Sequence, residues 1–164
     1  MPGRVPAGGV FLLLCWALVS SPITADFTAG LEAYERAEYA TALHEWQPLA
    51  DAGVVEAQFN LGLLYYLGRG VRRDVAVAHA WFLRAAKAGY ARAQYRVAEM
   101  YELGDGVRKD FVQAHYWFRL AGDQKEGDAK KRRRRLAKKM TPEQIAYADM
   151  LARDYKRDRR ATRE

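Results

Sequence analysis

The stretch that decides the fold is AQFNLGLLYYLGRGVRRDVAVAHAWFLRAAKAG, residues 57–89, because it returns at once as AQYRVAEMYELGDGVRKDFVQAHYWFRLAG, residues 93–122. Sliding residues 53–88 onto 89–124 needs no gap and matches 15 of 36 positions. Self-similarity at a constant spacing is typical of repeat proteins, in which each unit stacks on the next. The sequence therefore predicts tandem copies of one unit.

Each copy has the pattern of two helices joined by a glycine turn. Apolar and small residues recur at helical spacing over 54–67 and again over 75–88. Gly68 follows the first run, where a helix commonly ends in a left-handed residue. Asp74 precedes the second run, where a carboxylate can accept the first free backbone N–H groups. We therefore expect an all-α, right-handed α/α solenoid of helix pairs.

The pattern extends in weaker form on both sides of the two clear copies. Residues 27–52 supply a divergent first unit, with apolar positions at Phe27, Leu31 and Tyr34 and a shorter loop near residues 37–39. In the C-terminal cap, residues 125–158, the run TPEQ at 141–144 predicts a helix start with a capping box. With units 53–88 and 89–124 this makes four helix pairs over residues 26–158, followed by a tail over 159–164.

Residues 1–25 have the order of a secretory signal peptide. Arg4 precedes an apolar run over 10–19, which contains Cys15, and small residues lead to Ala25. The run is about half of the ~20 residues that span a bilayer. We expect removal of this segment and a periplasmic or secreted protein, with an uncleaved membrane anchor as the alternative. The mature chain would hold no cysteine, which suits an oxidising compartment and excludes a disulfide framework.

The residues that could carry chemistry form no catalytic or metal-binding pattern. Serine occurs only at positions 20 and 21, and the sequence contains no phosphate-binding loop. His79 and His115 occupy the same repeat position, so stacked helices would hold them about 10 Å apart, too far to share a zinc ion. His44 is isolated. We predict no catalytic residue, no metal and no cofactor, and hence a protein that is not an enzyme.

The repeated motif resembles the Sel-one-like repeat (SLR), a relative of the tetratricopeptide repeat. The matching residues, from Ala57 to Gly89, are A-Q-x-x-L-G-x-x-Y-x-x-G-x-G-V-x-x-D-x-x-x-A-x-x-W-F-x-x-A-A-x-x-G. The second copy departs from them at Val97-Ala98 and Gly122. The resemblance implies a short exported bacterial member that serves as a non-enzymatic adaptor or scaffold for other proteins. A branch linked to β-lactams carries a cysteine pair in each repeat, and this chain lacks those pairs.

Positions that differ between the two copies are the ones free to encode a partner. In such solenoids the concave surface, lined by the first helix of each unit, is the usual recognition face. A mixed acidic, basic and aromatic surface there would suit a protein or peptide segment. The candidate partner-binding residues are Asn60, Leu63, Tyr66, Arg96, Glu99 and Glu102.

Charge is concentrated at the C-terminal end. Residues 125–164 hold 15 Lys or Arg against 7 Asp or Glu, whereas residues 26–124 hold 11 against 13. This basic cap could contact anionic lipid or polymer of the envelope, while nucleic acid is a poor candidate for an exported protein. Alternatively it is the solvated face of a capping helix, with at least one arginine stem lying along the preceding unit. The run consists of Lys130, Lys131, Arg132, Arg133, Arg134 and Arg135.

Overall fold

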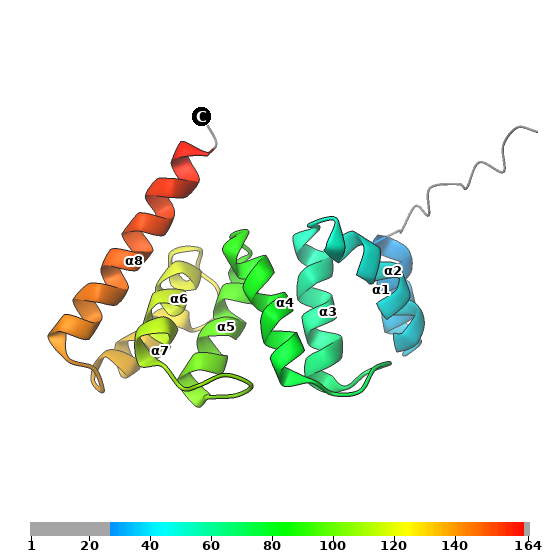
Figure 1. Cartoon of the computed structure of the whole chain (residues 1–164), viewed down its shortest axis with the longest axis horizontal. Helices are drawn as coiled ribbons and strands as arrows, with labels where there is room; N and C mark the ends of the chain where they lie inside the picture. The colour runs from blue at the N-terminus through cyan, green and yellow to red at the C-terminus, as the bar shows by residue number, and fades with distance from the viewer. Residues whose placement is uncertain (1–26, 163–164) are drawn as a thin grey trace, which may run out of the picture.

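The computed structural model describes residues 27–162, which fold into eight α-helices arranged in one stack (Figure 1). Each helix from α1 to α7 packs against its neighbours in the chain, and α8 packs against α6. The prediction of an all-α fold of paired helices is therefore confirmed. The helices are α1 (Phe27–Glu35), α2 (Tyr39–Asp51), α3 (Val55–Leu67), α4 (Val75–Lys87), α5 (Ala91–Leu103), α6 (Phe111–Asp123), α7 (Ala129–Ala137) and α8 (Pro142–Ala161).

The turn within each repeat has the predicted chemistry. Gly68 and Gly104 end α3 and α5 with φ angles of 67° and 76°, the left-handed region that glycine enters without a side-chain clash. Asp74 caps α4 by accepting a hydrogen bond from the Val77 backbone N–H. Asp110 caps α6 in the same way. These local signals set where the helices begin and end.

The two repeats also pack in the same way. The Phe59 and Phe82 ring centroids lie 5.5 Å apart, and so do those of Tyr95 and Phe118, the residues 36 positions later. Phe82 lies so close to Gly62 that an added Cβ would come within 2.5 Å of the ring. The small residue in the first helix of the pair therefore makes room for the large one in the second.

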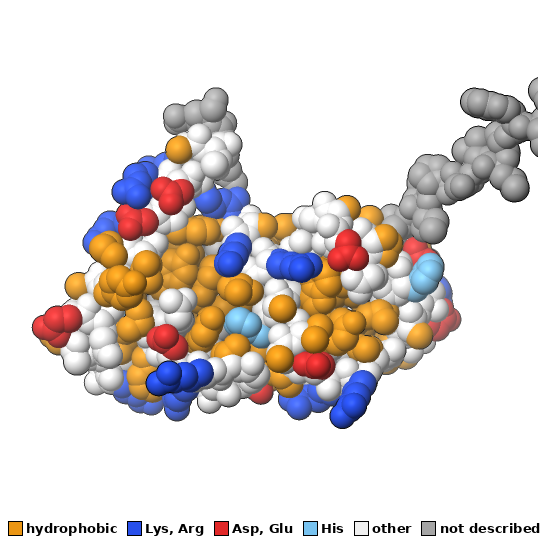
Figure 2. Space-filling model, viewed as in Figure 1, with side chains coloured by type: hydrophobic (Ala, Val, Ile, Leu, Met, Phe, Trp, Pro, Cys, Tyr) orange, Lys and Arg blue, Asp and Glu red, His pale blue; other side chains and the backbone are white. Residues whose placement is uncertain are grey.

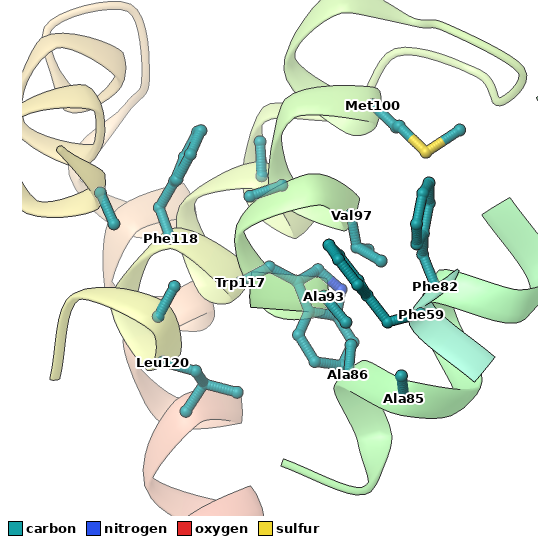
Figure 3. Packing of buried hydrophobic residues seen from close by; sticks show 14 of the residues in the cluster. Phe59, Phe82, Ala85, Ala86, Ala93, Val97, Met100, Trp117, Phe118 and Leu120 are labelled. Carbon is teal, nitrogen blue, oxygen red and sulfur yellow. The ribbon is translucent and has the colours of Figure 1, made fainter. Parts of the chain in front are cut away.

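The core consists of two hydrophobic clusters that meet at α4. The N-terminal cluster contains Trp46 and Leu61. The C-terminal cluster, shown in Figure 3, contains Phe82 and Phe118. The side chain of Trp81 packs against the N-terminal cluster, whereas that of its neighbour Phe82 belongs to the C-terminal one. Consecutive residues of one helix thus connect the two halves of the solenoid.

The first unit follows the same rule with one difference from the expectation. The indole of Trp46 lies against Gly30, as Phe82 lies against Gly62. The buried residues of α1 are Gly30 and Ala33, which share one helix face, while Leu31 is 36% exposed. Leu31, one of the apolar positions from which this helix was predicted, thus lies at the surface, while Gly30 lies beneath the Trp46 ring.

The C-terminal cap is built as the TPEQ run predicts. The Thr141 hydroxyl accepts from the Gln144 backbone N–H at 3.3 Å, and the Gln144 side-chain oxygen accepts from the Thr141 N–H at 3.0 Å. Ala148 and Ala152 form the buried stripe of α8. This helix continues to Ala161, so it includes the first residues of the segment expected to be a tail.

The expected signal peptide, residues 1–25 with Cys15, lies outside the described residues. No helix within residues 27–162 combines the length and the apolar character that crossing a bilayer requires.

Candidate protein-interaction grooves

A groove between α3 and α5 brings together four of the six predicted partner-binding residues. Leu63 and Tyr66 come from α3, and Arg96 and Glu99 come from α5. The groove, called here the α3–α5 groove, has a volume of about 180 Å³. Its remaining lining residues are Leu67, Phe82, Met100, Leu103 and Asp105.

The polar groups of this groove are paired with one another. The Tyr66 hydroxyl donates to the Asp105 carboxylate at 2.8 Å, and this hydrogen bond raises the pKa of the Tyr66 phenol. Arg96 donates to Glu99 at 2.9 Å. Leu67 and Leu103 are 46% and 66% exposed. The groove therefore offers apolar contact surface together with fixed polar groups, a combination suited to a side chain of a bound segment.

The other two predicted residues lie elsewhere. Asn60 is half-buried on α3 and does not line the groove. Glu102 is buried, and its carboxylate accepts from Arg132 at 2.6 Å and from Arg135 at 3.2 Å. Arg132 also contacts Glu99. The carboxylates of α5 thus hold α7 in place. From the sequence we predicted only that an arginine stem would lie along the preceding unit.

The predicted basic patch is divided between internal pairs and solvent. Arg132 and Arg135 bind Glu102, and Arg133 approaches Asp149 of α8 at 3.9 Å. Lys130, Lys131 and Arg134 are exposed, and within residues 27–162 they form no ion pair. Half of the patch therefore contributes to the docking of α7, and the other half remains available at the surface.

The repeat histidines are framework residues in this structure. His79 is half-buried, with its ring edge-on to Tyr101 at a centroid distance of 5.3 Å. His115 is buried, and its Nδ1 lies 3.9 Å from the Asp149 carboxylate. Burial lowers the pKa of both histidines. Among the described residues no three potential ligands gather as a metal site would require.

A second and larger groove shares no lining residue with the first and was not predicted from the sequence. It has a volume of about 1310 Å³ and is lined by residues of α4, α6 and α8, by Tyr101 of α5 and by the loop before α6. Figure 2 shows apolar side chains gathered between α8, at the left, and α4, near the centre. This α4–α8 groove lies over α6, on which α8 packs. Its two walls meet where the Tyr155 hydroxyl of α8 donates to the Lys87 carbonyl at the end of α4, at 3.2 Å.

The comparisons with known proteins agree with this geometry. Residues 55–90 and 91–126 each match the model of the Sel1 repeat. The chain is a Sel1 repeat (SLR) protein, and repeats of this family generally mediate protein interactions. The family consists of repeat scaffolds that are typically non-enzymatic. The matched units begin two residues after those proposed from the sequence, 53–88 and 89–124.

Two solved structures resemble the chain over most of its described length. A protective antigen present in uropathogenic Escherichia coli strains, which displays an SLR fold, is 32% identical with a TM-score of 0.72 over 77% of this chain. A Sel1 repeat protein from Oxalobacter formigenes is 31% identical with a TM-score of 0.63 over 66% of this chain. The chain spans 28% and 44% of the lengths of these two proteins. No curated protein matches its sequence.

Proposed function

We propose that this protein is a non-enzymatic adaptor of the bacterial envelope that holds a protein or peptide segment in the α3–α5 groove. The observation that carries the proposal is the convergence of Leu63, Tyr66, Arg96 and Glu99 on one groove. These are positions at which the two repeats differ, so they are not needed for the packing that both repeats share. The side chains at these positions can therefore vary to fit a binding partner without disturbing the shared packing.

The chemistry of the groove favours a segment with an apolar anchor. Leu63, Phe82 and Met100 supply an apolar floor, and the exposed side chains of Leu67 and Leu103 lie beside it. An aliphatic or aromatic side chain of the partner would be buried there, while the partner backbone would meet the paired polar groups at the rim. The leader-like residues 1–25 support an exported location.

The test uses a peptide library displayed on phage and selected on the purified protein. Selected peptides should share an apolar anchor and lose at least about tenfold in affinity when Leu67 and Leu103 are both changed to Glu, because each change puts a charge where apolar surface is buried. Exchanging the charges of Arg96 and Glu99 is a poorer test, since Glu99 also contacts Arg132.

The control is Leu31→Glu, the same substitution at an exposed leucine of α1 outside the groove. It should leave the affinity unchanged. Equal loss of affinity in the control, or selected peptides that bind the Leu67→Glu/Leu103→Glu variant as tightly as the original protein, would contradict the proposal.

One observation favours a second function, contact of the basic cap with an anionic envelope surface. Lys130, Arg134 and Lys138 are exposed and spaced by four residues, so they form one stripe along α7 and its C-terminal end. This mode predicts sedimentation with vesicles of anionic lipid but not with neutral ones, and a steep loss between about 50 and 200 mM salt. Substituting Glu at all three positions should abolish it, and salt-insensitive binding would exclude it.

A further inference from the structure

The α4–α8 groove has two walls and a floor made of three helices. Leu83 and Lys87 of α4 form one wall, and α8 forms the other over the stretch from Gln144 to Tyr155. Tyr116 lies on the floor, on α6. The α8 wall corresponds to about 16 Å of helix axis, or three turns. Tyr147, 53% exposed, lies one turn from both Gln144 and Leu151 and extends the apolar surface of this wall.

The size of the groove matches a helix. A cylinder about 10 Å across and 16 Å long occupies on the order of 1,300 Å³, close to the groove volume of about 1310 Å³. A helix lying on α6 between α4 and α8 would repeat the helix-on-helix packing that builds the rest of the molecule. A single extended strand would leave much of this space unfilled.

Both ends of the groove are positively charged. Lys87 is the last residue of α4, which ends on the upper side of the stack in Figure 1. Arg108 and Lys109 lie in the loop before α6, on the lower side. The only carboxylate among the lining residues is that of Asp110, which already accepts hydrogen bonds from the α6 backbone. Within residues 27–162, Lys87 and Arg108 form no ion pair, so their charges are not neutralised by the protein.

The middle of the groove is apolar and uncharged. Burial raises the pKa of Tyr116 to about 12, so its phenol stays neutral at physiological pH. Trp117 and Tyr155 stand beside it with ring centroids 6.5 Å apart. An occupant that fits must therefore bury apolar side chains at its centre and carry negative charge towards its ends.

We propose that the α4–α8 groove binds an acidic amphipathic helix of a partner protein, about three turns long, with its apolar face on α6 and its carboxylates beside Lys87 and Arg108. The charge complementarity at both ends selects this occupant over a basic or neutral helix. This docking surface is separate from the α3–α5 groove, so an adaptor with both could hold two partners at once.

The test uses a fluorescein-labelled helical peptide of about 14 residues, with leucines spaced three and four apart and glutamates towards both ends. A second probe has lysine in place of each glutamate. At about 50 mM salt, fluorescence anisotropy should show the purified protein binding the acidic probe at least tenfold more tightly than the basic one. The Lys87→Glu/Arg108→Glu variant should lose this preference or reverse it.

The matched control is Lys130→Glu/Lys131→Glu, which makes the same charge change on α7 away from the groove and should keep the preference. Leu67→Glu/Leu103→Glu should also keep it, so failure here is distinguishable from failure of the α3–α5 groove. Equal binding of both probes, or equal effects of the two charge-reversal pairs, would overturn the proposal. So would a dimer in sedimentation that Lys87→Glu/Arg108→Glu dissociates, because the occupant would then be a second copy.

Discussion

At the scale of single residues, the Ala-Gln pair near the start of each repeat supplies a buried glutamine that links neighbouring units. Gln58 donates from its side-chain nitrogen to the Ala50 carbonyl at 3.1 Å, and Gln94 donates to the Ala86 carbonyl at 3.2 Å. Both carbonyls lie in the last turn of the preceding helix, where backbone acceptors lack partners within the helix. The glutamine therefore joins one unit to the unit before it.

The two glutamines should differ in their contribution to stability. The Gln94 side-chain oxygen accepts from Gln124 at 2.9 Å, whereas the Gln58 side-chain oxygen is buried without a hydrogen bond among the described residues. Changing Gln58 to Ala should lower the free energy of unfolding by about 1 kcal/mol, and Gln94→Ala should cost more, about 2 kcal/mol. Urea unfolding measures both. A larger loss for Gln58→Ala would contradict the difference in hydrogen bonding.

The histidines should make stability depend on pH. Burial lowers the pKa of His79 and His115 below the value of about 6.5 expected for the unfolded chain, although Asp149 partly opposes this for His115. The unfolded chain therefore binds more protons, and stability is present above pH 6.5 and lost as pH falls through the folded-state values.

Between pH 7 and 5 the free energy of unfolding should fall by at most about 1.4 kcal/mol per pH unit for each histidine. The His79→Gln/His115→Gln variant should show a flatter dependence in the same urea-unfolding series. If the free energy of unfolding depends on pH equally steeply in the variant, other titrating groups cause the dependence.

At the scale of helices, the docking of α7 rests on Arg132. Its side chain is 13% exposed and reaches Glu99 and Glu102 of α5, while its guanidinium lies 4.9 Å from the ring centroid of Phe118 on α6. The Tyr95 hydroxyl accepts from it at 3.2 Å. One arginine thus bridges three helices, and the basic run serves the fold as well as the surface.

Removing Arg132 alone should lower the free energy of unfolding more than removing both Arg132 and the charge of Glu102. Arg132→Met leaves the Glu102 carboxylate buried with only Arg135 and should cost about 3 kcal/mol. Adding Glu102→Gln should restore part of that loss, because the uncompensated charge disappears. A double-mutant cycle in urea unfolding measures the coupling. Additive losses would show that the pair is not coupled.

At the scale of the whole molecule, stability should decrease from the centre of the solenoid to its ends. The helices α3 to α6 have neighbours on both sides, whereas α1 packs mainly on α2. The last turns of α8 extend beyond its buried stripe. Nearest-neighbour cohesion therefore favours opening from the ends. Amide hydrogen exchange should be slowest in α4 and α5 and fastest in α1 and after Tyr155. Uniform protection would indicate a single cooperative unit.

Much of this architecture could be predicted from spacing and local chemistry. The repeat period, the left-handed Gly68, the Asp74 cap and the Thr141 capping box depend on residues within a few positions of one another. Such features are encoded locally, because helix periodicity and backbone conformation involve only near neighbours. Four of the six candidate groove residues followed from the same reasoning, since equivalent positions of stacked repeats lie side by side.

The remaining features depend on how distant helices meet. The placement of the helices in space decides which arginines of the basic run turn inward and leaves Leu31 facing solvent. It also leaves a groove between α8 and α4. Four consecutive arginines are equivalent in sequence until α5 presents its carboxylates to two of them, Arg132 and Arg135. The periodicity of a chain specifies the faces of its helices, but the contacts that those faces make depend on the distances between helices, which local spacing does not encode.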